Sequence, residues 1–224
     1  MLGTLYVVAT PVGNLGDITK RAVEILEKVD VILAEDTRVT NKLLAKFDIK
    51  TKTISYHAHS GENTKNRILK LLVEGSTLAL VTDAGTPGIS DPGNELIDWL
   101  LAKEPKIKVI PIPGPSAITT ALSVCGFNVQ NFEFFGFFPK KKRTKWFKRI
   151  ASGKKVYVFF ESPNRLLKTL GELKGHIGRE RRLFVARELT KMYEETYRGD
   201  IEEILKKLKK SNPKGEVVVV VEKV

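Results

Sequence analysis

The chain has 224 residues, 42% of them hydrophobic and 29% charged, with a formal net charge of +12. This composition is typical of a globular protein with a substantial core, and the length allows two domains. No apolar run approaches about 18 residues, which argues against a transmembrane helix. The single Cys125 excludes an internal disulfide. The first residues have no basic segment and lead directly into a predicted strand, so we expect no secretory signal and a cytoplasmic location.

The first half of the chain alternates between short apolar runs and amphipathic helices. Strands are predicted at 5–9, 31–34, 53–56, 78–81 and 109–112, with a helix after each of the first four. Asp17 is expected to cap the first helix, and Gly75 to end the third. This β–α alternation predicts a parallel sheet that is covered by helices on both faces.

Three prolines and a glycine between Pro111 and Pro115 predict a stiff linker. We therefore expect two α/β domains, residues 1–112 and 113–224. In the second domain, helices are predicted at 117–124, 166–170 and 201–208, and strands at 132–138, 156–160, 183–186 and 217–221. Because strands follow both helices and other strands, we expect a mixed sheet. The five phenylalanines of 132–138 are expected to lie mostly in the core.

The segment Val81–Gly93 is a long connection between a predicted buried strand and a predicted helix. It reads Val-Thr-Asp-Ala-Gly-Thr-Pro-Gly-Ile-Ser-Asp-Pro-Gly, whereas such connections usually have about two to six residues. In an open α/β sheet, ligands bind beyond the carboxyl ends of the strands. We interpret the segment as one side of a ligand site; the alternative is a plain strand-to-helix connection.

The excess of positive charge lies entirely in the second half of the chain. Residues 1–112 contain 14 Lys and Arg against 14 Asp and Glu, whereas residues 113–224 contain 24 against 12. The densest part, residues 140–155, has nine basic residues and no acidic residue. Solvated lysine-rich faces usually include glutamate, so this stretch favours contact with a polyanion such as nucleic acid.

Several common site motifs are absent from the sequence. There is no G-x-G-x-x-G after the first strand, no Walker lysine and no G-x-S-x-G elbow. Their absence argues against ordinary dinucleotide enzymes, P-loop enzymes and hydrolases. His57 and His59 form a His-x-His pair, but no third histidine is near them in the sequence, so we expect no metal site.

Six segments of the chain together resemble a known family. They are Ala9–Ile18, Ala34–Arg38 (Ala-Glu-Asp-Thr-Arg), Asp83–Gly93, Pro113–Ala117, Glu161–Arg165 (Glu-Ser-Pro-Asn-Arg) and Ala186–Lys191 (Ala-Arg-Glu-Leu-Thr-Lys). Their combination resembles the tetrapyrrole methylase superfamily and, within it, the ribosomal RNA small subunit methyltransferase I family. The resemblance covers nearly the whole chain.

This resemblance implies an α/β fold of two domains with an active-site cleft between them. It also implies S-adenosylmethionine as the methyl donor, a homodimer, and 2′-O-methylation of a cytidine in the decoding region of 16S ribosomal RNA. Carried over motif by motif, the donor contacts are Thr10, Pro11, Asp83, Ala84, Gly85, Ile89, Ser116, Ala117, Phe160, Glu161, Arg187, Glu188, Leu189, Lys214 and Gly215. Many family members are longer at the C-terminal end, so we expect residues 140–155 to carry more of the RNA contact here.

Methyl transfer to a ribose hydroxyl requires a positioned acceptor and help with the loss of its proton. Asp36, Glu161 and Glu188 are candidates for the base, but each has an alternative role in a salt bridge or a helix cap. Asp83 and Asp91 are expected to position the donor and the loop. Because basic side chains bind phosphate, the candidate RNA contacts are Arg38, Lys140, Lys141, Lys142, Arg143, Lys145, Arg165 and Arg187.

Two other functions stay open at this point. The first is a small-molecule methyltransferase that acts on a tetrapyrrole, since carboxylate-rich tetrapyrroles are anionic too. The second is an RNA-binding protein that does not bind a methyl donor.

Overall fold

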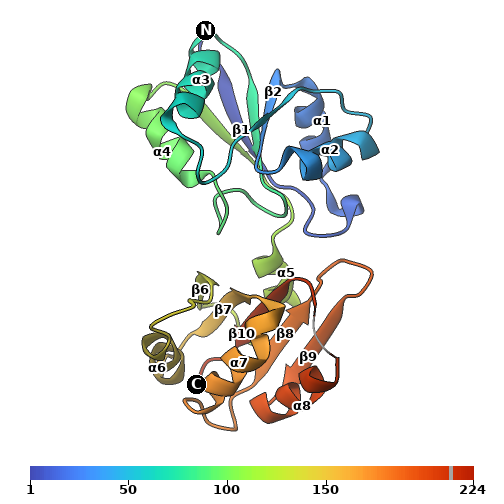
Figure 1. Ribbon diagram of the computed structural model, residues 1–224, viewed down its shortest axis with the longest axis vertical. Coiled ribbons are helices and arrows are strands. Elements are labelled where there is room, and N and C mark those ends of the chain that lie inside the picture. The colour runs from blue at the N-terminus through green and yellow to red at the C-terminus, as the bar shows by residue number, and fades with distance from the viewer. Residues whose placement is uncertain (212–213) are drawn as a thin grey trace. The chain divides into compact units, whose positions relative to one another are not determined.

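The computed structural model describes residues 1–211 and 214–224, which form two compact units, Met1–Ser116 and Ala117–Val224. Each unit contains one five-stranded sheet. Helices cover both faces of each sheet (Figure 1). The units are described one at a time below.

The first unit is built on a parallel sheet with the strand order β3-β2-β4-β1-β5. Its strands are β1 (Thr4–Val8), β2 (Val31–Ala34), β3 (Thr53–Ser55), β4 (Leu78–Val81) and β5 (Lys108–Ile112). Every residue of β2 and β4 is buried, which explains why both are continuous apolar runs rather than alternating ones. The predicted parallel sheet is confirmed.

Two helices cover each face of this sheet. The helices α1 (Lys20–Lys28) and α2 (Thr37–Lys46) lie on one face, and α3 (Glu62–Val73) and α4 (Asn94–Lys103) lie on the other (Figure 1). Two separate apolar clusters result, one on each side of the strands. The predicted two-sided cover is therefore present.

The start of the first helix differs from the prediction. Asp17 lies in a short 3-10 helix, Leu15–Asp17, and α1 begins only at Lys20. The cap is Thr19, whose Oγ1 accepts a hydrogen bond from Ala22 N at 3.1 Å. The predicted end of α3 is correct, because Gly75 has φ +97° and its N–H donates to Leu72 O at 3.1 Å.

The second unit is built on a mixed sheet with the strand order β6-β7-β10-β8-β9, as predicted. Its strands are β6 (Phe132–Phe137), β7 (Val156–Glu161), β8 (Leu183–Arg187), β9 (Glu195–Gly199) and β10 (Val217–Val221). β6 and β7 are parallel, and the other neighbours are antiparallel. The five buried valines of β10 form the centre of the sheet.

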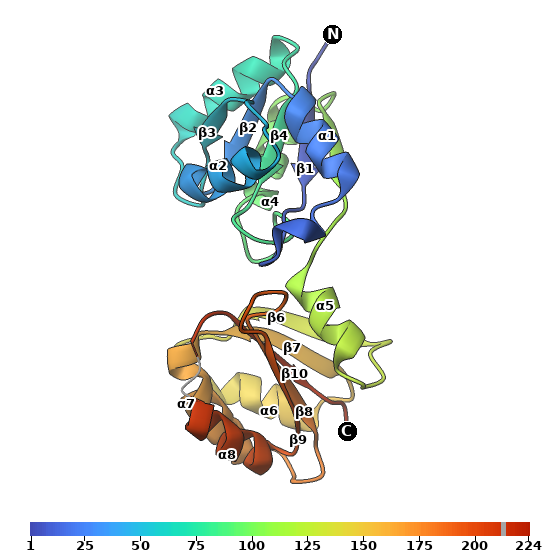
Figure 2. The same ribbon diagram turned by 90° about the vertical axis from the view of Figure 1, so that its right-hand side faces the viewer.

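One helix covers one face of this sheet, and three cover the other. The helix α5 (Ala117–Val124) packs on the first face, while α6 (Thr144–Ser152), α7 (Pro163–Lys174) and α8 (Ile201–Ser211) pack on the second (Figure 2). No helix in the described ranges is long and apolar enough to span a membrane.

Three features of the second unit were not predicted. β9 is a polar edge strand without an apolar run. α6 lies within the basic stretch, where Phe147 and Ile150 are buried and Trp146 packs against the core. Three of the five phenylalanines of 132–138 pack into the core as expected, namely Phe134, Phe135 and Phe138, but Phe132 and Phe137 are exposed. The reason is that β6 is an edge strand, so its side chains are covered less completely than those of central strands.

Candidate functional site

In the first unit, the loops that follow β1 and β4 are joined through their main chains. Thr10 N donates to Gly85 O at 2.9 Å, and Gly85 N donates to Thr10 O at 3.1 Å. The Thr10 hydroxyl donates to Thr82 O at 3.0 Å and is buried. The two loops that the family resemblance assigned to donor binding are therefore joined by hydrogen bonds at the carboxyl ends of neighbouring parallel strands.

The long loop 81–93 depends on left-handed backbone at several positions. Gly85 and Gly88 have φ values of +85° and +83°, and Ser90 has φ +70°. Asn94 at the start of α4 donates to Gly88 O at 2.8 Å and so holds the far side of the loop. Glycine adopts such φ values without steric cost, and the hydrogen bonds with Thr10 and Asn94 hold the loop in this shape.

Carboxylates gather where β2 and β4 end. The Thr82 hydroxyl donates to Glu35 Oε2 at 2.7 Å, and the Asp36 N–H donates to Asp83 Oδ1 at 3.0 Å. Burial raises the pKa of Asp83, and the charges of Glu35 and Asp36 raise it further, although the hydrogen bond from Asp36 N opposes the rise. Asp83 therefore holds a proton more readily than an ordinary aspartate.

Asp36 is occupied by Arg38. Its side chain caps α2 by accepting from Arg38 N at 2.8 Å, and it forms an ion pair with the Arg38 guanidinium at 2.6 Å. The side-chain hydrogen bond from Arg38, followed by that from its main chain, lowers the pKa of Asp36 to about 2. So acidic a carboxylate is a weak proton acceptor, which argues against Asp36 as the base. The Arg38 side chain itself is 87% exposed.

In the second unit, three separate predicted segments meet at one end of the sheet. In the strand register, Val217 lies between Glu161 on one side and Arg187 on the other. Arg187 Nη1 donates to Lys214 O at 3.1 Å. The ends of β7 and β8 and the start of β10 are thus brought together, as the resemblance implied.

Glu188 lies within this group but is not free to act as a base. Its Oε1 accepts from Glu216 N and from Lys191 Nζ, both at 2.9 Å. Burial would raise the pKa of Glu188, but these two hydrogen bonds and the charge of Lys191 outweigh that effect and lower it. The side chain also covers Gly215, where any Cβ would lie 2.1 Å from Glu188 Oε1. Glu188 thus shapes the turn before β10.

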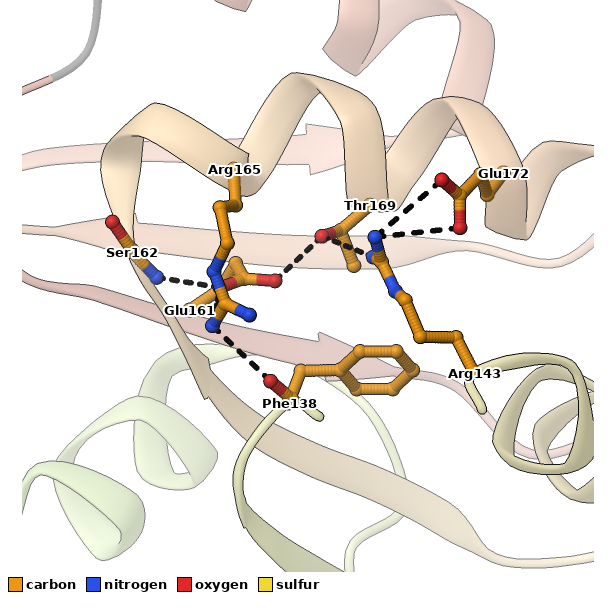
Figure 3. A network of polar contacts seen from close by, with 7 residues as sticks. All are labelled: Phe138, Arg143, Glu161, Ser162, Arg165, Thr169 and Glu172. Carbon is orange, nitrogen blue, oxygen red and sulfur yellow. Dashed lines mark hydrogen bonds and ion pairs between the residues drawn. The ribbon is translucent and has the colours of Figure 1, made fainter. Parts of the chain in front are cut away.

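Glu161 is the most enclosed of the candidate bases. Its side chain is fully buried, and both of its oxygens are engaged (Figure 3). Oε1 accepts from Ser162 N at 2.7 Å and forms an ion pair with Arg165 Nη2 at 2.5 Å, and Oε2 accepts from the Thr169 hydroxyl at 2.5 Å. A substrate proton has no path to either oxygen, so the geometry argues against Glu161 as the base.

The candidate RNA contacts divide into two groups. Four lysines are exposed: Lys140, Lys141, Lys142 and Lys145. Three arginines are mostly enclosed instead, with side chains that are 10% (Arg143), 23% (Arg165) and 12% (Arg187) exposed. Each of the three is paired with a glutamate, so we correct their predicted role as free phosphate contacts.

Two residues that the sequence did not single out shape this part of the unit. Glu133 on β6 pairs with Arg149 at 2.6 Å and with Lys155 at 4.0 Å, so the basic stretch is partly neutralised from outside its own sequence. Thr169 on α7 links Glu161 to Arg143. No local sequence signal marks either residue, because their partners belong to other elements.

Comparison with known proteins identifies the family. The family model described as Tetrapyrrole (Corrin/Porphyrin) Methylases matches residues 4–205. A protein of Synechocystis sp. named ribosomal RNA small subunit methyltransferase I is 46% identical over 222 residues, which are 98% of this chain and 79% of the relative. A protein of the same name from Thermotoga maritima is 45% identical over 220 residues, covering 98% of each chain.

Solved structures also match. The crystal structure of the methyltransferase CobJ has a TM-score of 0.73 and 16% identity, covering 99% of this chain and 95% of CobJ. At that identity, the likeness shows the fold alone.

Proposed function

This chain belongs to the tetrapyrrole methylase family and, within it, to the ribosomal RNA small subunit methyltransferase I proteins, and we propose that it transfers a methyl group from S-adenosylmethionine to ribosomal RNA of the small subunit. More finely, we propose the 2′-hydroxyl of a cytidine in the decoding region of 16S ribosomal RNA as the acceptor. The observation that carries the proposal is the 46% identity to a relative of that name over 98% of the chain.

The loop 81–93 suits a cationic donor. S-adenosylmethionine carries a positive sulfonium and an ammonium group, together with ribose hydroxyls. Residues 82–93 include Asp83 and Asp91 and no lysine or arginine. A negatively charged loop attracts these cations, and an ionised Asp83 accepts hydrogen bonds from hydroxyl or ammonium groups.

We propose that both units supply donor contacts. In the first unit these are Thr10, Pro11, Asp83, Ala84, Gly85, Ile89 and Ser116. In the second unit they are Ala117, Phe160, Glu161, Arg187, Glu188, Leu189, Lys214 and Gly215. Because the carboxyl groups of Glu161 and Glu188 are occupied, these two residues would contact the donor through their main chains.

The bound donor supplies an activated methyl group, and the chain's own residues supply position. Asp36, Glu161 and Glu188 are each held by basic side chains or main-chain N–H groups. We therefore assign none of them as the base, and propose that the enzyme acts mainly by holding the acceptor oxygen in line with the methyl carbon.

RNA is proposed to bind through the exposed lysines of the second unit and through Arg38. Lys140, Lys141, Lys142 and Lys145 are exposed and have no ion pair within residues 1–211 and 214–224. Exposed lysines of this kind contact phosphates without sequence preference.

Following the family resemblance, we also propose a homodimer, which sedimentation at micromolar concentration would test.

The direct test uses 30S particles from a bacterial strain that lacks this methylation. Purified protein and labelled S-adenosylmethionine should place label on the 2′-oxygen of one decoding-region cytidine, located by nuclease digestion and mass spectrometry. Label at another nucleotide would refute the finer proposal. Label on a tetrapyrrole but not on RNA would support the small-molecule alternative, and donor binding without transfer to RNA or tetrapyrrole would refute both.

A further inference from the structure

The segment between β6 and α6 carries three consecutive exposed lysines, Lys140–Lys142, which we call the lysine loop. It has no helical or strand structure of its own. Both of its ends are nevertheless held by side chains of the Glu161–Arg165 motif and of α7. The lysine loop is therefore a short bridge between two fixed points.

The first fixed point is Phe138. Its N–H donates to Phe160 O at 2.8 Å, and its carbonyl oxygen accepts from Arg165 Nη2 at 3.1 Å (Figure 3). The residue is 1% exposed, and its ring stacks on Phe147 of α6 with ring centroids 5.1 Å apart. The main chain and the side chain of Phe138 are thus both fixed.

The second fixed point is Arg143. Its Nη2 donates to the Thr169 hydroxyl at 2.5 Å, and its Nη1 lies 3.3 Å from Glu172 Oε2. The guanidinium also lies over the rings of Phe138 and Phe147, at 5.4 and 5.3 Å from their centroids. Although it belongs to the basic stretch, this arginine is directed into its own unit rather than toward solvent.

Glu161 connects the two fixed points. The Thr169 hydroxyl accepts from Arg143 and at the same time donates to Glu161 Oε2, while Glu161 Oε1 forms an ion pair with Arg165 (Figure 3). One buried carboxylate therefore orients the arginine that holds Phe138 and the threonine that holds Arg143. The oxygens of Glu161 and Thr169 are all engaged, whereas Arg143 Nε and two nitrogens of Arg165 are buried without a hydrogen-bond partner in the described part of the chain. The contacts that are made still orient the side chains, because hydrogen bonds are strong in a buried environment.

Two local features show that the ends need this support. Lys142 has φ +54°, a left-handed conformation that costs a non-glycine residue free energy. The helix α6 has no side-chain cap at Arg143, and it carries Lys145 in its first turn, where the helix dipole disfavours positive charge. Neither feature is stable on local grounds, so tertiary contacts must maintain both.

We propose that Glu161, Arg165, Thr169 and Arg143 are positioning residues that hold the lysine loop in one conformation for the RNA phosphate backbone. This inference rests on the proposed function, because it takes RNA as the partner. Its physical basis is entropy: a loop that is already ordered loses less conformational freedom when its lysines meet phosphates. The Glu-Ser-Pro-Asn-Arg motif would then serve RNA affinity rather than the chemistry of transfer.

The test compares two arginine-to-lysine variants that both keep the positive charge. Arg143→Lys cannot bridge Thr169 and Glu172 as the planar guanidinium does. Arg182→Lys is the matched control, since Arg182 also pairs with a glutamate, Glu222, and lies 5.3 Å from the centroid of the Phe127 ring, but is remote in sequence from the lysine loop. Glu172→Gln is a milder second variant, because Glu172 is partly exposed and its loss leaves Arg143 bonded to Thr169.

The readouts are RNA affinity, donor affinity and amide hydrogen exchange. The N–H groups of Trp146 and Phe147 donate to Arg143 O at 2.9 and 3.1 Å, so their exchange reports on whether Arg143 is held. Arg143→Lys should weaken binding to a 16S ribosomal RNA fragment about tenfold and speed exchange at both amides. The S-adenosylmethionine affinity of Arg143→Lys should stay within about twofold of wild type. Glu172→Gln should weaken RNA binding and speed amide exchange in the same way, but less. Arg182→Lys should change neither RNA affinity, donor affinity nor exchange.

Three results would overturn the inference. The first is faster exchange in Arg143→Lys with unchanged RNA affinity, which would show that loop order is irrelevant to binding. The second is an equal loss of RNA and donor affinity, which would show a merely structural role. The third is an equal effect in Arg182→Lys. If the wild-type protein neither binds nor methylates the RNA, the proposed function and this inference both fail. If the wild-type protein is active and the RNA affinity of Arg143→Lys equals that of wild type, this inference alone is refuted.

Discussion

Thr10 and Gly85 exchange both of their main-chain hydrogen bonds, although they belong to loops that follow different strands. The pair fixes the start of loop 81–93 against the loop after β1. Gly85 adopts φ +85° there, a region that residues with a Cβ rarely occupy. The shape of the proposed donor loop therefore depends on the absence of a side chain at this position.

We expect Gly85→Ala to lower the free energy of unfolding by about 1–2 kcal/mol, because the left-handed backbone strains an alanine. A Cβ at Gly85 would lie 3.5 Å from Val12 Cγ1, which is an ordinary contact, so the strain is conformational rather than steric. Urea unfolding measures the stability, and calorimetry with S-adenosylmethionine should show weaker binding.

The control for this change is Gly61→Ala. Gly61 has φ −69°, and a Cβ there would meet nothing within 4 Å. Gly61 is the N-cap of α3, where alanine caps less well than glycine, but alanine also restricts the unfolded chain, so these opposed effects should keep the change in stability below about 1 kcal/mol. Equal effects of the two substitutions would contradict the role assigned to the Gly85 backbone.

Asp36 should give a measurable pH dependence of stability. The hydrogen bonds from Arg38 lower the pKa of Asp36 from an ordinary 3.8 to about 2. Because the folded pKa lies below the unfolded one, the ion pair stabilises the protein above about pH 4, and its contribution is lost as the pH falls toward about 2. Unfolding of wild type and Asp36→Asn by urea should therefore differ most above pH 4 and converge near pH 2. A difference that is independent of pH would show that the ionised carboxylate has no part in it.

Asp83, whose pKa is shifted in the opposite direction, should make donor binding depend on pH. Burial and neighbouring negative charge raise its pKa in the free protein, and a bound cation would lower it, so donor affinity should fall as the pH falls through the raised pKa. Asp83→Asn should reduce S-adenosylmethionine affinity about tenfold or more, because a charge-assisted hydrogen bond is lost. Calorimetry in two buffers of different ionisation enthalpy should detect proton release for wild type but not for the variant. Undiminished binding by Asp83→Asn would place the donor elsewhere.

The lysine loop should account for part of the salt dependence of RNA binding. Replacing Lys140, Lys141 and Lys142 with glutamine should reduce the slope of log K against log salt concentration by about two, at roughly 0.7–0.9 per phosphate contact. Fluorescence titration from low to moderate salt measures the slope. The matched control replaces Lys20, Lys42 and Lys46, three exposed lysines of the first unit, with glutamine. An equal flattening in both variants would mean that net charge, and not this loop, determines binding.

Much of the fold could be predicted from local patterns. The bounds of β2, β4 and β10 agree with the predicted runs, because strands that are buried on both sides must be apolar at every position. The helix α6 and strand β9 could not be found in this way, since one carries few apolar residues among many basic ones and the other is a polar edge strand. Asp17 was a plausible cap in sequence, but Thr19 makes the hydrogen bond.

Roles of charged residues depended far more on the folded chain. Sequence alone grouped Arg143 with the exposed lysines and Glu161 with the candidate bases, whereas in the structure Thr169 joins the two. Burial can be predicted from the local sequence, since a residue facing the core must be apolar whichever residues it contacts. The role of a charged side chain cannot be predicted in this way. It depends on which partner from another element lies within about 3 Å, and only folding brings that partner near.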